Sequence, residues 1–270
     1  MKYLSGLELV GYIKERQAKQ VRTLRQAHRV LPRLAIVQTV DDPVIDTYVR
    51  LKKQYGQDIL IEVTHVKTDQ ERIADEISKL NDDPSIHAII IQLPLADTSK
   101  TDEVLAMVSP QKDVDGLGAV HSFDPATALA INWLCAGYNI DLSRQSILIV
   151  GQGRLVGAPL ARMWRDSGYN VATITKSDDG DLASACHDAT VIVSGAGVPG
   201  LIKSDMIRPD TVVIDAGTAS ESGKIVGDIS AEVYEREDLK ITPQKGGVGP
   251  LTVAALFDNV IRAAGQTIQA

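Results

Sequence analysis

The sequence predicts an α/β protein of two parts, each containing a parallel sheet, and three observations predict it. Short apolar runs alternate with helical patterns along the whole chain, a glycine turn lies near its middle, and the strand–helix rhythm restarts after a helical stretch. This alternation is typical of a parallel sheet with helices on its faces. The 270 residues, of which 44% are hydrophobic, are enough for two domains of moderate size.

The first half of the chain has the pattern of a βαβαβ unit. The expected strands are Arg33 to Val40, Leu60 to Val66 and Ile86 to Leu93, and the expected helices are Thr47 to Tyr55 and Gln70 to Leu80. Each expected strand is rich in aliphatic or β-branched residues. Thr68 and Glu71 have the spacing of a capping box, so the second helix should begin there and end at Asp82-Asp83-Pro84.

The second half repeats the rhythm after an expected helix from Ala126 to Gly137. The expected strands, each nearly all apolar, are Ile147 to Val150, Asn170 to Thr175, Thr190 to Ser194 and Thr211 to Ala216. Such runs belong in a parallel sheet that is covered on both faces. A last helix, Leu251 to Ala264, should follow the glycine turn Gly246-Gly247-Val248-Gly249-Pro250.

Composition and charge exclude several classes of protein. The net charge is −7, and no cluster of Lys and Arg has aromatic residues between its members, which argues against a nucleic-acid groove. Charged residues interrupt the apolar N-terminus and no apolar run approaches membrane-spanning length, so a cytoplasmic protein is expected. Cys135 and Cys186 lack a partner motif and should be buried packing residues in a reducing compartment. The five histidines have no paired spacing, so no metal site is expected.

The central glycine turn, Gly151-Gln152-Gly153-Arg154-Leu155-Val156-Gly157, is the clearest ligand signal. It follows an apolar strand and opens a helical stretch that ends near Asp166. Backbone N–H groups and the positive helix end meet a pyrophosphate at such a place, so the turn predicts dinucleotide binding. Its third glycine comes four residues after the second instead of three, and a tight turn without a ligand is the alternative interpretation.

Polar side chains in the first half could contact one ligand. Tyr48 and Lys52 are four residues apart on an expected helix and therefore share a face. Gln92 lies near the carboxyl end of a buried strand, where open parallel sheets bind ligands. Asp113 and Asp115 form an acidic turn. A solvated helix face is the alternative for the tyrosine–lysine pair taken alone.

Several strings, in order along nearly the whole chain, resemble those of the bifunctional methylenetetrahydrofolate dehydrogenase/cyclohydrolase (FolD) family. They are Tyr48-Val49-Arg50-Leu51-Lys52, Ile91-Gln92-Leu93-Pro94-Leu95, Lys112-Asp113-Val114-Asp115-Gly116, the central glycine turn, Val213-Ile214-Asp215-Ala216-Gly217, Gly227-Asp228, and Thr242-Pro243 with Gly246-Gly247-Val248-Gly249-Pro250-Leu251-Thr252. The resemblance implies oxidation of 5,10-methylenetetrahydrofolate to 5,10-methenyltetrahydrofolate with NAD(P)+, and hydrolysis of that product to 10-formyltetrahydrofolate. It also implies a homodimer that forms through the cofactor domain.

The resemblance assigns roles to single residues. Lys52 is the central catalytic residue, and Gln92 holds and tunes it. Tyr48 stacks or hydrogen-bonds at the folate, and Asp115 binds the pterin ring. The implied lining of the same cleft is Gly247, Val248 and Pro250, and the implied cofactor-binding residues are Thr127, Gly151, Gln152, Gly153, Arg154, Val156, Gly157, Lys176 and Ser177.

The resemblance also implies a domain organisation, with two α/β domains on either side of a cleft. Residues 1–121 with 250–270 form the folate-binding catalytic domain, so the C-terminal helix returns to the first domain. Residues 122–249 form a Rossmann-type NAD(P)-binding domain.

The chemistry sets a condition on the lysine. Water attacks a methenyl cation, so a neutral lysine could act as base or proton relay. Its pKa, about 10.4 in water, must then be lowered by burial or by positive neighbours. Lys53 and the substrate cation are the candidate neighbours.

The chain departs from the family pattern at several places. Ile45 stands where the family has Ser, and Pro125-Ala126-Thr127-Ala128-Leu129-Ala130 replaces a Pro-Cys-Thr-Pro-x-Gly string. Gln152 replaces an arginine expected near the adenosine phosphate, and Lys245 replaces a proline. A monofunctional dehydrogenase and a folate- or nucleotide-binding regulator without turnover therefore stand as alternatives.

The cofactor preference depends on the residues after the strand that ends at Thr175. Lys176 and Ser177 could bind a 2′-phosphate, whereas Asp178 and Asp179 could favour a free ribose hydroxyl. We expect NADP, with NAD as the alternative.

Overall fold

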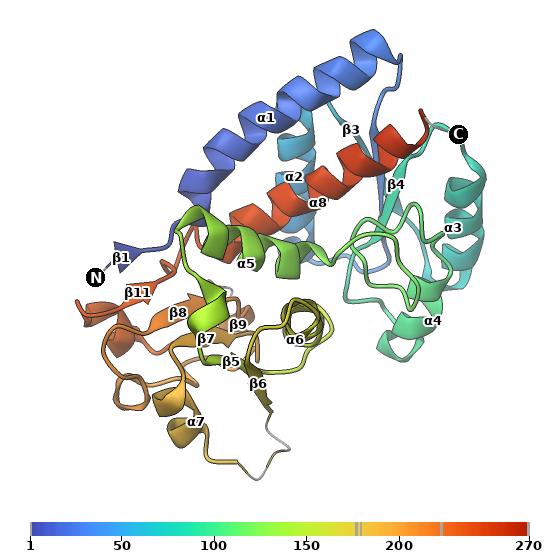
Figure 1. Ribbon diagram of the computed structural model, residues 1–270. Coiled ribbons are helices and arrows are strands. Elements are labelled where there is room, and N and C mark those ends of the chain that lie inside the picture. Colours follow the sequence, from blue (N-terminus) through green and yellow to red (C-terminus); the bar gives the residue numbers. More distant parts are fainter. Residues whose placement is uncertain (1, 176–177, 179, 222–223, 269–270) are drawn as a thin grey trace. The chain divides into compact units, whose positions relative to one another are not determined.

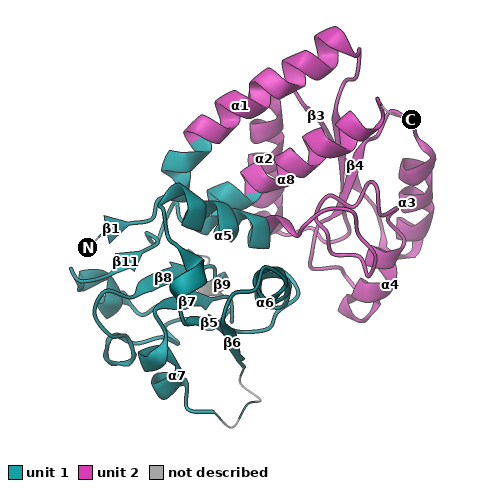
Figure 2. Cartoon of the chain, in the orientation of Figure 1, with its two compact units in different colours: residues 1–10, 127–252 teal, residues 11–126, 253–270 magenta. Residues whose placement is uncertain are grey.

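The computed structural model describes residues 2–175, 178, 180–221 and 224–268 (Figure 1). The chain divides into two compact units. Unit 1 comprises Met1–Val10 and Thr127–Thr252, and unit 2 comprises Gly11–Ala126 and Val253–Ala270 (Figure 2). The helices α1 (Gly6–Ala27) and α8 (Val248–Gln266) each contribute residues to both units.

Unit 2 contains a three-stranded parallel sheet in the order β3-β2-β4. Its strands are β2 (Arg33–Gln38), β3 (Glu62–Lys67) and β4 (Ala88–Ile91), and its further helices are α2 (Pro43–Asp58), α3 (Ile73–Asp82) and α4 (Thr101–Ala106). On one face Val37 of β2 packs in a cluster with Ile77 of α3, and Leu34 and Ile36 of β2 are also fully buried. Figure 1 shows α3 on one side of these strands and α2 on the other. Both faces of the sheet are therefore covered, which explains its continuous apolar runs.

Helix α2 extends beyond the expected range at both ends. Asp42 caps its N-terminus, because one carboxylate oxygen accepts the N–H groups of Val44 (2.7 Å) and Ile45 (3.1 Å). Pro43 occupies the first helical position, where its fixed φ favours a helix and no N–H is needed. These residues start the helix four positions before Thr47, the start expected from the apolar pattern.

The expected capping box at Thr68 and Glu71 is wrong. A 3-10 turn over Gln70–Arg72 precedes α3, and the residues at the two N-cap positions, Asp69 and Arg72, make no side-chain capping hydrogen bond. The first α-helical residue is Ile73, so Thr68 lies too far before it to reach its first N–H groups. The Thr68 N–H instead donates to the carbonyl oxygen of Gln38 at the end of β2.

Helix α1 was not among the elements expected from the sequence. Its buried positions include Val10, Gln17, Val21 and Leu24, which follow helical spacing. Gln17 is fully buried in the middle of this stripe, where its amide donates to the carbonyl oxygen of Ala254 (2.8 Å). A polar residue in the centre of the apolar stripe weakens the sequence pattern that would reveal the helix.

Unit 1 contains a six-stranded parallel sheet in the order β1-β11-β8-β7-β5-β6. Its strands are β1 (Lys2–Tyr3), β5 (Ile147–Val150), β6 (Val171–Ile174), β7 (Val191–Ser194), β8 (Val212–Asp215) and β11 (Lys240–Ile241), and its helices include α5 (Ala126–Gly137), α6 (Gly157–Asp166) and α7 (Leu182–Asp188). A separate antiparallel hairpin joins β9 (Ala219–Glu221) to β10 (Lys224–Val226). The strands expected from the sequence in both halves are confirmed, with ends that differ by at most two residues.

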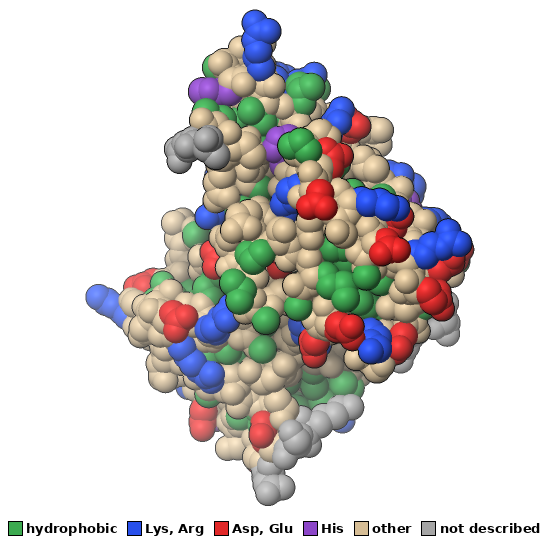
Figure 3. All heavy atoms as spheres, turned by 90° about the vertical axis from the view of Figure 1, so that its right-hand side faces the viewer, with side chains coloured by type: hydrophobic (Ala, Val, Ile, Leu, Met, Phe, Trp, Pro, Cys, Tyr) green, Lys and Arg blue, Asp and Glu red, His purple; other side chains and the backbone are tan. Residues whose placement is uncertain are grey.

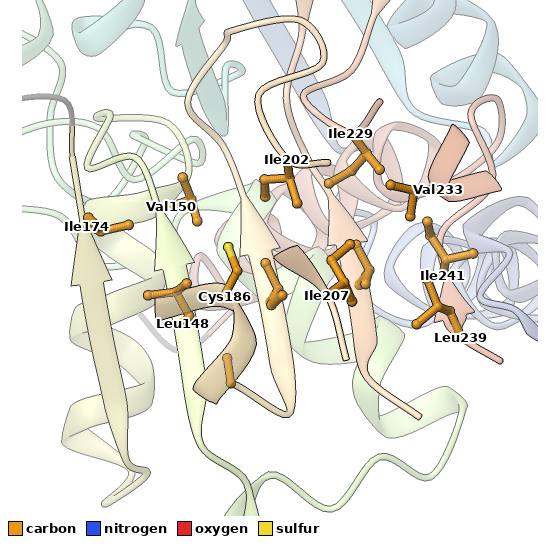
Figure 4. Packing of buried hydrophobic residues seen from close by; sticks show 13 residues of the cluster. Leu148, Val150, Ile174, Cys186, Ile202, Ile207, Ile229, Val233, Leu239 and Ile241 are labelled. Carbon is orange, nitrogen blue, oxygen red and sulfur yellow. The ribbon is translucent and has the colours of Figure 1, made fainter. Parts of the chain in front are cut away.

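The core of unit 1 lies on both faces of its sheet. On one face Leu148 and Val150 of β5 pack with Ile174 of β6 and with Cys186 of α7 (Figure 4). The alternate residues of β5 are buried as well, as is Trp164 of α6. Cys135 and Cys186 are both buried free thiols, as expected.

Each end of the chain packs in a unit whose other residues are distant from it in sequence. β1 extends the unit 1 sheet, with the Leu4 N–H donating to the Ile241 carbonyl oxygen (2.9 Å), so Met1–Val10 fall in unit 1, whereas the sequence division placed residues 1–121 together. The C-terminal helix α8 lies in unit 2 from Val253 onward, where Phe257 stacks on Tyr55 of α2 with ring centroids 5.1 Å apart. The expected two-part α/β class and the return of the last helix are confirmed.

The surface carries charges of both signs. Lys and Arg side chains are interspersed with Asp and Glu side chains on the face shown in Figure 3, so this face has no continuous basic area. Among the described residues, no helix combines the length and the apolar character needed to cross a membrane.

Candidate active site and cofactor site

A lysine–glutamine contact lies at the centre of the candidate active site in unit 2. Tyr48 and Lys52 are one turn apart on α2 and both are half-buried. The Lys52 Nζ donates to the Gln92 Oε1 at 2.8 Å. Gln92 directly follows β4, and its Nε2 donates to the carbonyl oxygen of Leu93 (3.0 Å), which turns the amide oxygen toward the lysine. The sheet edge and α2 therefore bring together the residues expected to form a site.

The electrostatic environment of this pair favours proton transfer. Burial lowers the pKa of Lys52, while the carboxylate of Asp115 opposes that shift. Burial raises the pKa of Asp115, while the Lys52 ammonium opposes it. The expectation that Lys53 perturbs this lysine is wrong: burial causes the lower pKa, and Lys53 instead helps to lower the pKa of His65. A lysine in this setting loses its proton more readily than one in water, as a general base requires.

Tyr48 offers a neutral donor beside the lysine. Burial raises the pKa of its phenol above 10.0, so the hydroxyl keeps its proton at neutral pH. Ile45, one turn earlier on the same helix, is buried, with 6% of its surface exposed. The residue that replaces the family's serine is thus an apolar packing residue of α2.

The acidic turn after residue 112 holds two aspartates with different surroundings. Asp113 is buried and accepts the N–H groups of Gly116 (3.1 Å) and Gly118 (2.8 Å), which holds the turn together. Lys112 donates to three carbonyl oxygens at the end of α3, so it is a helix cap. Asp115 is the residue of this turn whose charge interacts with Lys52.

Asn259 supports this turn from the C-terminal helix, and sequence analysis missed it. Its Nδ2 donates to the carbonyl oxygens of Val114 and Asp124, each at 2.9 Å, and the residue is fully buried. Val114 immediately precedes Asp115, so this amide fixes the backbone beside the candidate ligand residue. The available sequence signal was a single asparagine on an otherwise apolar helix face.

The glycine turn in unit 1 forms the expected strand–turn–helix. Gly151 has φ +91°, which favours glycine, and its N–H donates to the Ile174 carbonyl oxygen. A Cβ atom on Gly157 would lie 1.8 Å from the Gly151 carbonyl oxygen, so α6 can begin this close to the strand only with glycine. A Cβ atom on Gly153 would have its nearest neighbour, the Gly195 carbonyl oxygen, at 3.8 Å. The turn therefore has no room for a side chain at Gly157, whereas it has room for one at Gly153.

The position of the turn in the sheet is that of a dinucleotide site. In the sheet, β5 has β6 on one side and β7 on the other, so the strand order reverses at β5. The carboxyl end of β5 is therefore a topological switch point, where open parallel sheets bind ligands. The loop that follows β7 packs there, because a Cβ atom on Gly195 would lie 2.8 Å from the Val156 side chain. The N-cap residue of α6, Val156, makes no side-chain capping hydrogen bond, and the helix dipole favours an anion there. These features fit a nicotinamide dinucleotide, whose pyrophosphate the turn and the helix end would hold.

Other expected cofactor residues lie around this turn. Gln152 donates from its amide to the Gly151 carbonyl oxygen (3.2 Å), Arg154 is exposed, and Thr127 is half-buried in the first turn of α5. Lys176, Ser177 and Asp179 lie outside the described residues. Asp178 accepts the N–H (2.5 Å) and the hydroxyl (3.0 Å) of Thr175, so one of its oxygens is bonded to the end of its own strand.

The glycine-rich segment before the last helix belongs to unit 1. Gly246 has φ +82°, and its carbonyl oxygen accepts the Leu7 N–H (2.9 Å). A Cβ atom on Gly6 would lie 2.0 Å from the Gly247 carbonyl oxygen, so the missing side chain of Gly6 allows close contact between this segment and α1. The expected loop through Pro250 is wrong, because α8 already begins at Val248 and its first turn accepts a proline.

Comparison with known proteins gives consistent matches over both units. The profile of the tetrahydrofolate dehydrogenase/cyclohydrolase catalytic domain matches residues 4–115, and that of the family's NAD(P)-binding domain matches residues 125–268. The bifunctional protein FolD of Sulfurovum sp. (strain NBC37-1) is 34% identical, over 98% of this chain and 99% of its own length.

Solved structures agree with these matches. The bifunctional FolD enzyme of Campylobacter jejuni has a TM-score of 0.91 and 33% identity, covering 99% of both chains. The Trypanosoma brucei dehydrogenase-cyclohydrolase (FolD), solved with NADP cofactor and an inhibitor, has a TM-score of 0.92 and 26% identity, covering 99% of this chain and 98% of that one. The chain therefore belongs to the tetrahydrofolate dehydrogenase/cyclohydrolase family, which confirms the resemblance seen in its sequence.

Proposed function

We propose that this chain carries out both reactions of its family. It oxidises 5,10-methylenetetrahydrofolate to 5,10-methenyltetrahydrofolate with NAD(P)+, and it hydrolyses that product to 10-formyltetrahydrofolate. The observation that carries the proposal is the Lys52–Gln92 contact, with Asp115 close enough to affect the lysine electrostatically. This arrangement holds an amine whose pKa is lowered, and hydrolysis needs such a base.

Each residue of the site has a role in these reactions. Lys52 takes the proton released when water adds to the methenyl carbon, and Gln92 holds the amine in place. Tyr48 contacts the folate, and Asp115 accepts hydrogen bonds from the pterin ring. Further folate contacts in this proposal are Gly247, Val248 and Pro250. NAD(P)+ supplies the acceptor for the hydride that leaves the methylene bridge.

The cofactor residues of unit 1 bind NADP+ in this proposal at least as well as NAD+. The proposed contacts are Thr127, Gly151, Gln152, Gly153, Arg154, Val156, Gly157, Lys176 and Ser177. The hydrogen bonds that Thr175 donates to Asp178 support the preference, because they engage one oxygen of the carboxylate that could otherwise bind a free ribose hydroxyl. The Lys176→Ala variant should raise the KM for NADP+ more than that for NAD+, by the roughly tenfold or more that a charge-assisted hydrogen bond contributes.

Domain roles, assembly and location belong to the same proposal. Folate chemistry takes place on residues 1–121 with 250–270, and nucleotide binding on residues 122–249. The protein acts as a cytoplasmic homodimer that pairs through the cofactor domain. Two free buried thiols suit a reducing compartment. Light scattering at micromolar concentration tests the dimer, and a monomeric mass would reject it.

An absorbance assay with the purified protein separates this function from its alternatives. Methylenetetrahydrofolate is supplied with NADP+ or NAD+, and reduced nicotinamide and methenyltetrahydrofolate are followed together. The proposal expects reduction with NADP+ and little accumulation of the methenyl product. A monofunctional dehydrogenase, which the buried Ile45 would favour, accumulates that product. A regulator without turnover changes neither signal.

A further inference from the structure

Two carboxylates and two glycines interlock beside the glycine turn of unit 1. We name Asp215, Gly217, Gly227 and Asp228 the carboxylate lock. A Cβ atom on Gly217 would lie 2.2 Å from the Asp228 carboxyl carbon, and one on Gly227 would lie 2.0 Å from the Asp215 Oδ2. Each carboxylate thus occupies the space that a side chain at the opposite glycine would fill. The Asp-x-Gly and Gly-Asp strings of the sequence become one packed unit.

Asp228 directs its carboxylate into the loop that follows β7. It is fully buried, and it accepts the Ser194 hydroxyl (2.7 Å). It also accepts the N–H groups of Ala196 (2.7 Å), Gly197 (3.3 Å) and Val198 (2.8 Å). Consecutive N–H groups that converge on one anion form a nest. A buried carboxylate must be hydrogen-bonded in this way, because an unpaired one would be very costly.

Asp215 in turn fixes the backbone that carries Asp228. Its carboxylate accepts the N–H groups of Gly217 (3.0 Å), Asp228 (3.1 Å) and Ile229 (3.2 Å). Asp215 ends β8, so the loops after two adjacent parallel strands are tied to one another at the carboxyl edge of the sheet.

The lock reaches the glycine turn through Ala196. A Cβ atom on Gly151 would lie 2.8 Å from the Ala196 Cα and 2.9 Å from its nitrogen, which is the nitrogen bonded to Asp228. The Ala196 backbone therefore forms one wall of the turn after β5. Because the N–H groups of residues 196–198 already donate to Asp228, the β7 loop shapes the site, and the pyrophosphate is left to the glycine turn and α6.

We propose that Asp228 is a positioning residue for NAD(P) binding, which rests on the dehydrogenase function proposed above. It holds the β7 loop against the glycine turn, and Asp215 holds Asp228. The hydrolysis reaction involves no nicotinamide and uses Lys52 of unit 2. Loss of the lock should therefore weaken cofactor binding while hydrolysis continues.

The Asp228→Asn variant tests the proposal, because an amide keeps the size of the side chain but presents an N–H₂ group to N–H donors. We expect its KM for NADP+ to rise about tenfold or more, as loss of hydrogen bonds to a charged group predicts. Dehydrogenase kcat at saturating NADP+ and the rate of methenyltetrahydrofolate hydrolysis should stay near the wild-type values. Asp205→Asn, an exposed charge removal in the same unit, should change none of the three.

The outcomes separate the possible failures. An unchanged KM for NADP+ in folded Asp228→Asn overturns the proposal, as does a parallel loss of hydrolysis, which would mean a general structural role. If Asp228→Asn does not fold, Ser194→Ala is the second test, because it removes one of the four hydrogen-bond donors to the Asp228 carboxylate. A raised KM for NADP+ in Ser194→Ala supports the proposal, and an unchanged KM overturns it. If wild-type protein catalyses neither reaction, the proposed function fails, and fluorescence titration of NADPH onto wild type and variant still tests the lock.

Discussion

The two candidate ligand sites of this chain differ in what forms them, side chains in one and backbone in the other. In unit 2 the site consists of functional side chains, with Lys52 bonded to Gln92 and shifted in pKa by burial. In unit 1 the part of the candidate site proposed to hold the pyrophosphate is backbone, and it depends on the missing Cβ atom at Gly157. A side-chain site should fail when a functional group is removed, whereas a backbone site should fail when an atom is added.

The largest expected effect comes from removing the amine of the side-chain site. Lys52→Met keeps most of the apolar stem, so the fold should survive while hydrolysis of methenyltetrahydrofolate falls at least about a hundredfold, a typical acid–base contribution. The absorbance of the methenyl compound measures the rate. Lys53→Met is the matched control, since the neighbouring lysine does not contribute to the pKa shift of Lys52. Near-normal hydrolysis by Lys52→Met would remove the lysine from the mechanism.

Adding one methyl group should damage the backbone site. In Gly157→Ala the new atom would meet the Gly151 carbonyl oxygen at 1.8 Å, so the turn must shift, at a cost of roughly 1–3 kcal/mol in unfolding free energy. NADPH affinity should fall with it, while hydrolysis persists. Denaturant unfolding and fluorescence titration measure the two effects. Gly153→Ala, whose Cβ has open space, should unfold like wild type. Equal stability of both variants would contradict the steric account.

Asn259 should link the C-terminal helix to folate binding. Asn259→Ala leaves the buried carbonyl oxygens of Val114 and Asp124 without their donor, which costs roughly 1–3 kcal/mol for an unsatisfied group. Because Val114 precedes Asp115, the KM for folate should rise in both reactions, while the KM for NADP+ stays unchanged. Steady-state kinetics in each reaction provide the comparison. A change in the KM for NADP+ with no change in the KM for folate would contradict the assignment of Asn259 to the folate site.

The smallest expected effect is a shift in the pH profile of hydrolysis. The Asp115 carboxylate stabilises the Lys52 ammonium and so raises its pKa against the effect of burial. Asp115→Asn removes that carboxylate, so the lysine pKa should fall further. The rising limb of kcat, which requires neutral lysine, should then move to lower pH. The profile is measured at saturating folate after subtraction of spontaneous hydrolysis. A rising limb that moves to higher pH would contradict the assignment of neutral Lys52 as the general base.

Sequence reasoning succeeded where a pattern is local. The strands of both sheets appear as apolar runs, and the glycine turn is recognised by its place between an apolar strand and a helical stretch. It failed where the deciding contact is distant: Gln17 is polar yet buried, because its partner Ala254 comes from the other end of the chain. The role of Asn259 was not predicted for the same reason, since its hydrogen-bond partners lie more than a hundred residues earlier in the chain.

Within the candidate site, the sequence predicted which residues take part better than it predicted what each of them does. Asp113 and Asp115 look alike in sequence, but the structure separates them: Asp113 accepts the hydrogen bonds that hold the turn, and Asp115 interacts electrostatically with Lys52. Lys53 looked like a perturber because it is adjacent in sequence, but burial proved to be the cause of the lysine pKa shift.

The most direct test of the two-site account is hydrolysis of methenyltetrahydrofolate by wild-type protein with no nicotinamide present. Water and a base suffice for this reaction, so the Lys52 site should accelerate it well above the spontaneous rate without NADP+. The dehydrogenase reaction of the same preparation should stop completely when NADP+ and NAD+ are omitted. Hydrolysis that stays at the spontaneous rate, in protein that oxidises methylenetetrahydrofolate normally, would contradict the account and leave a monofunctional dehydrogenase.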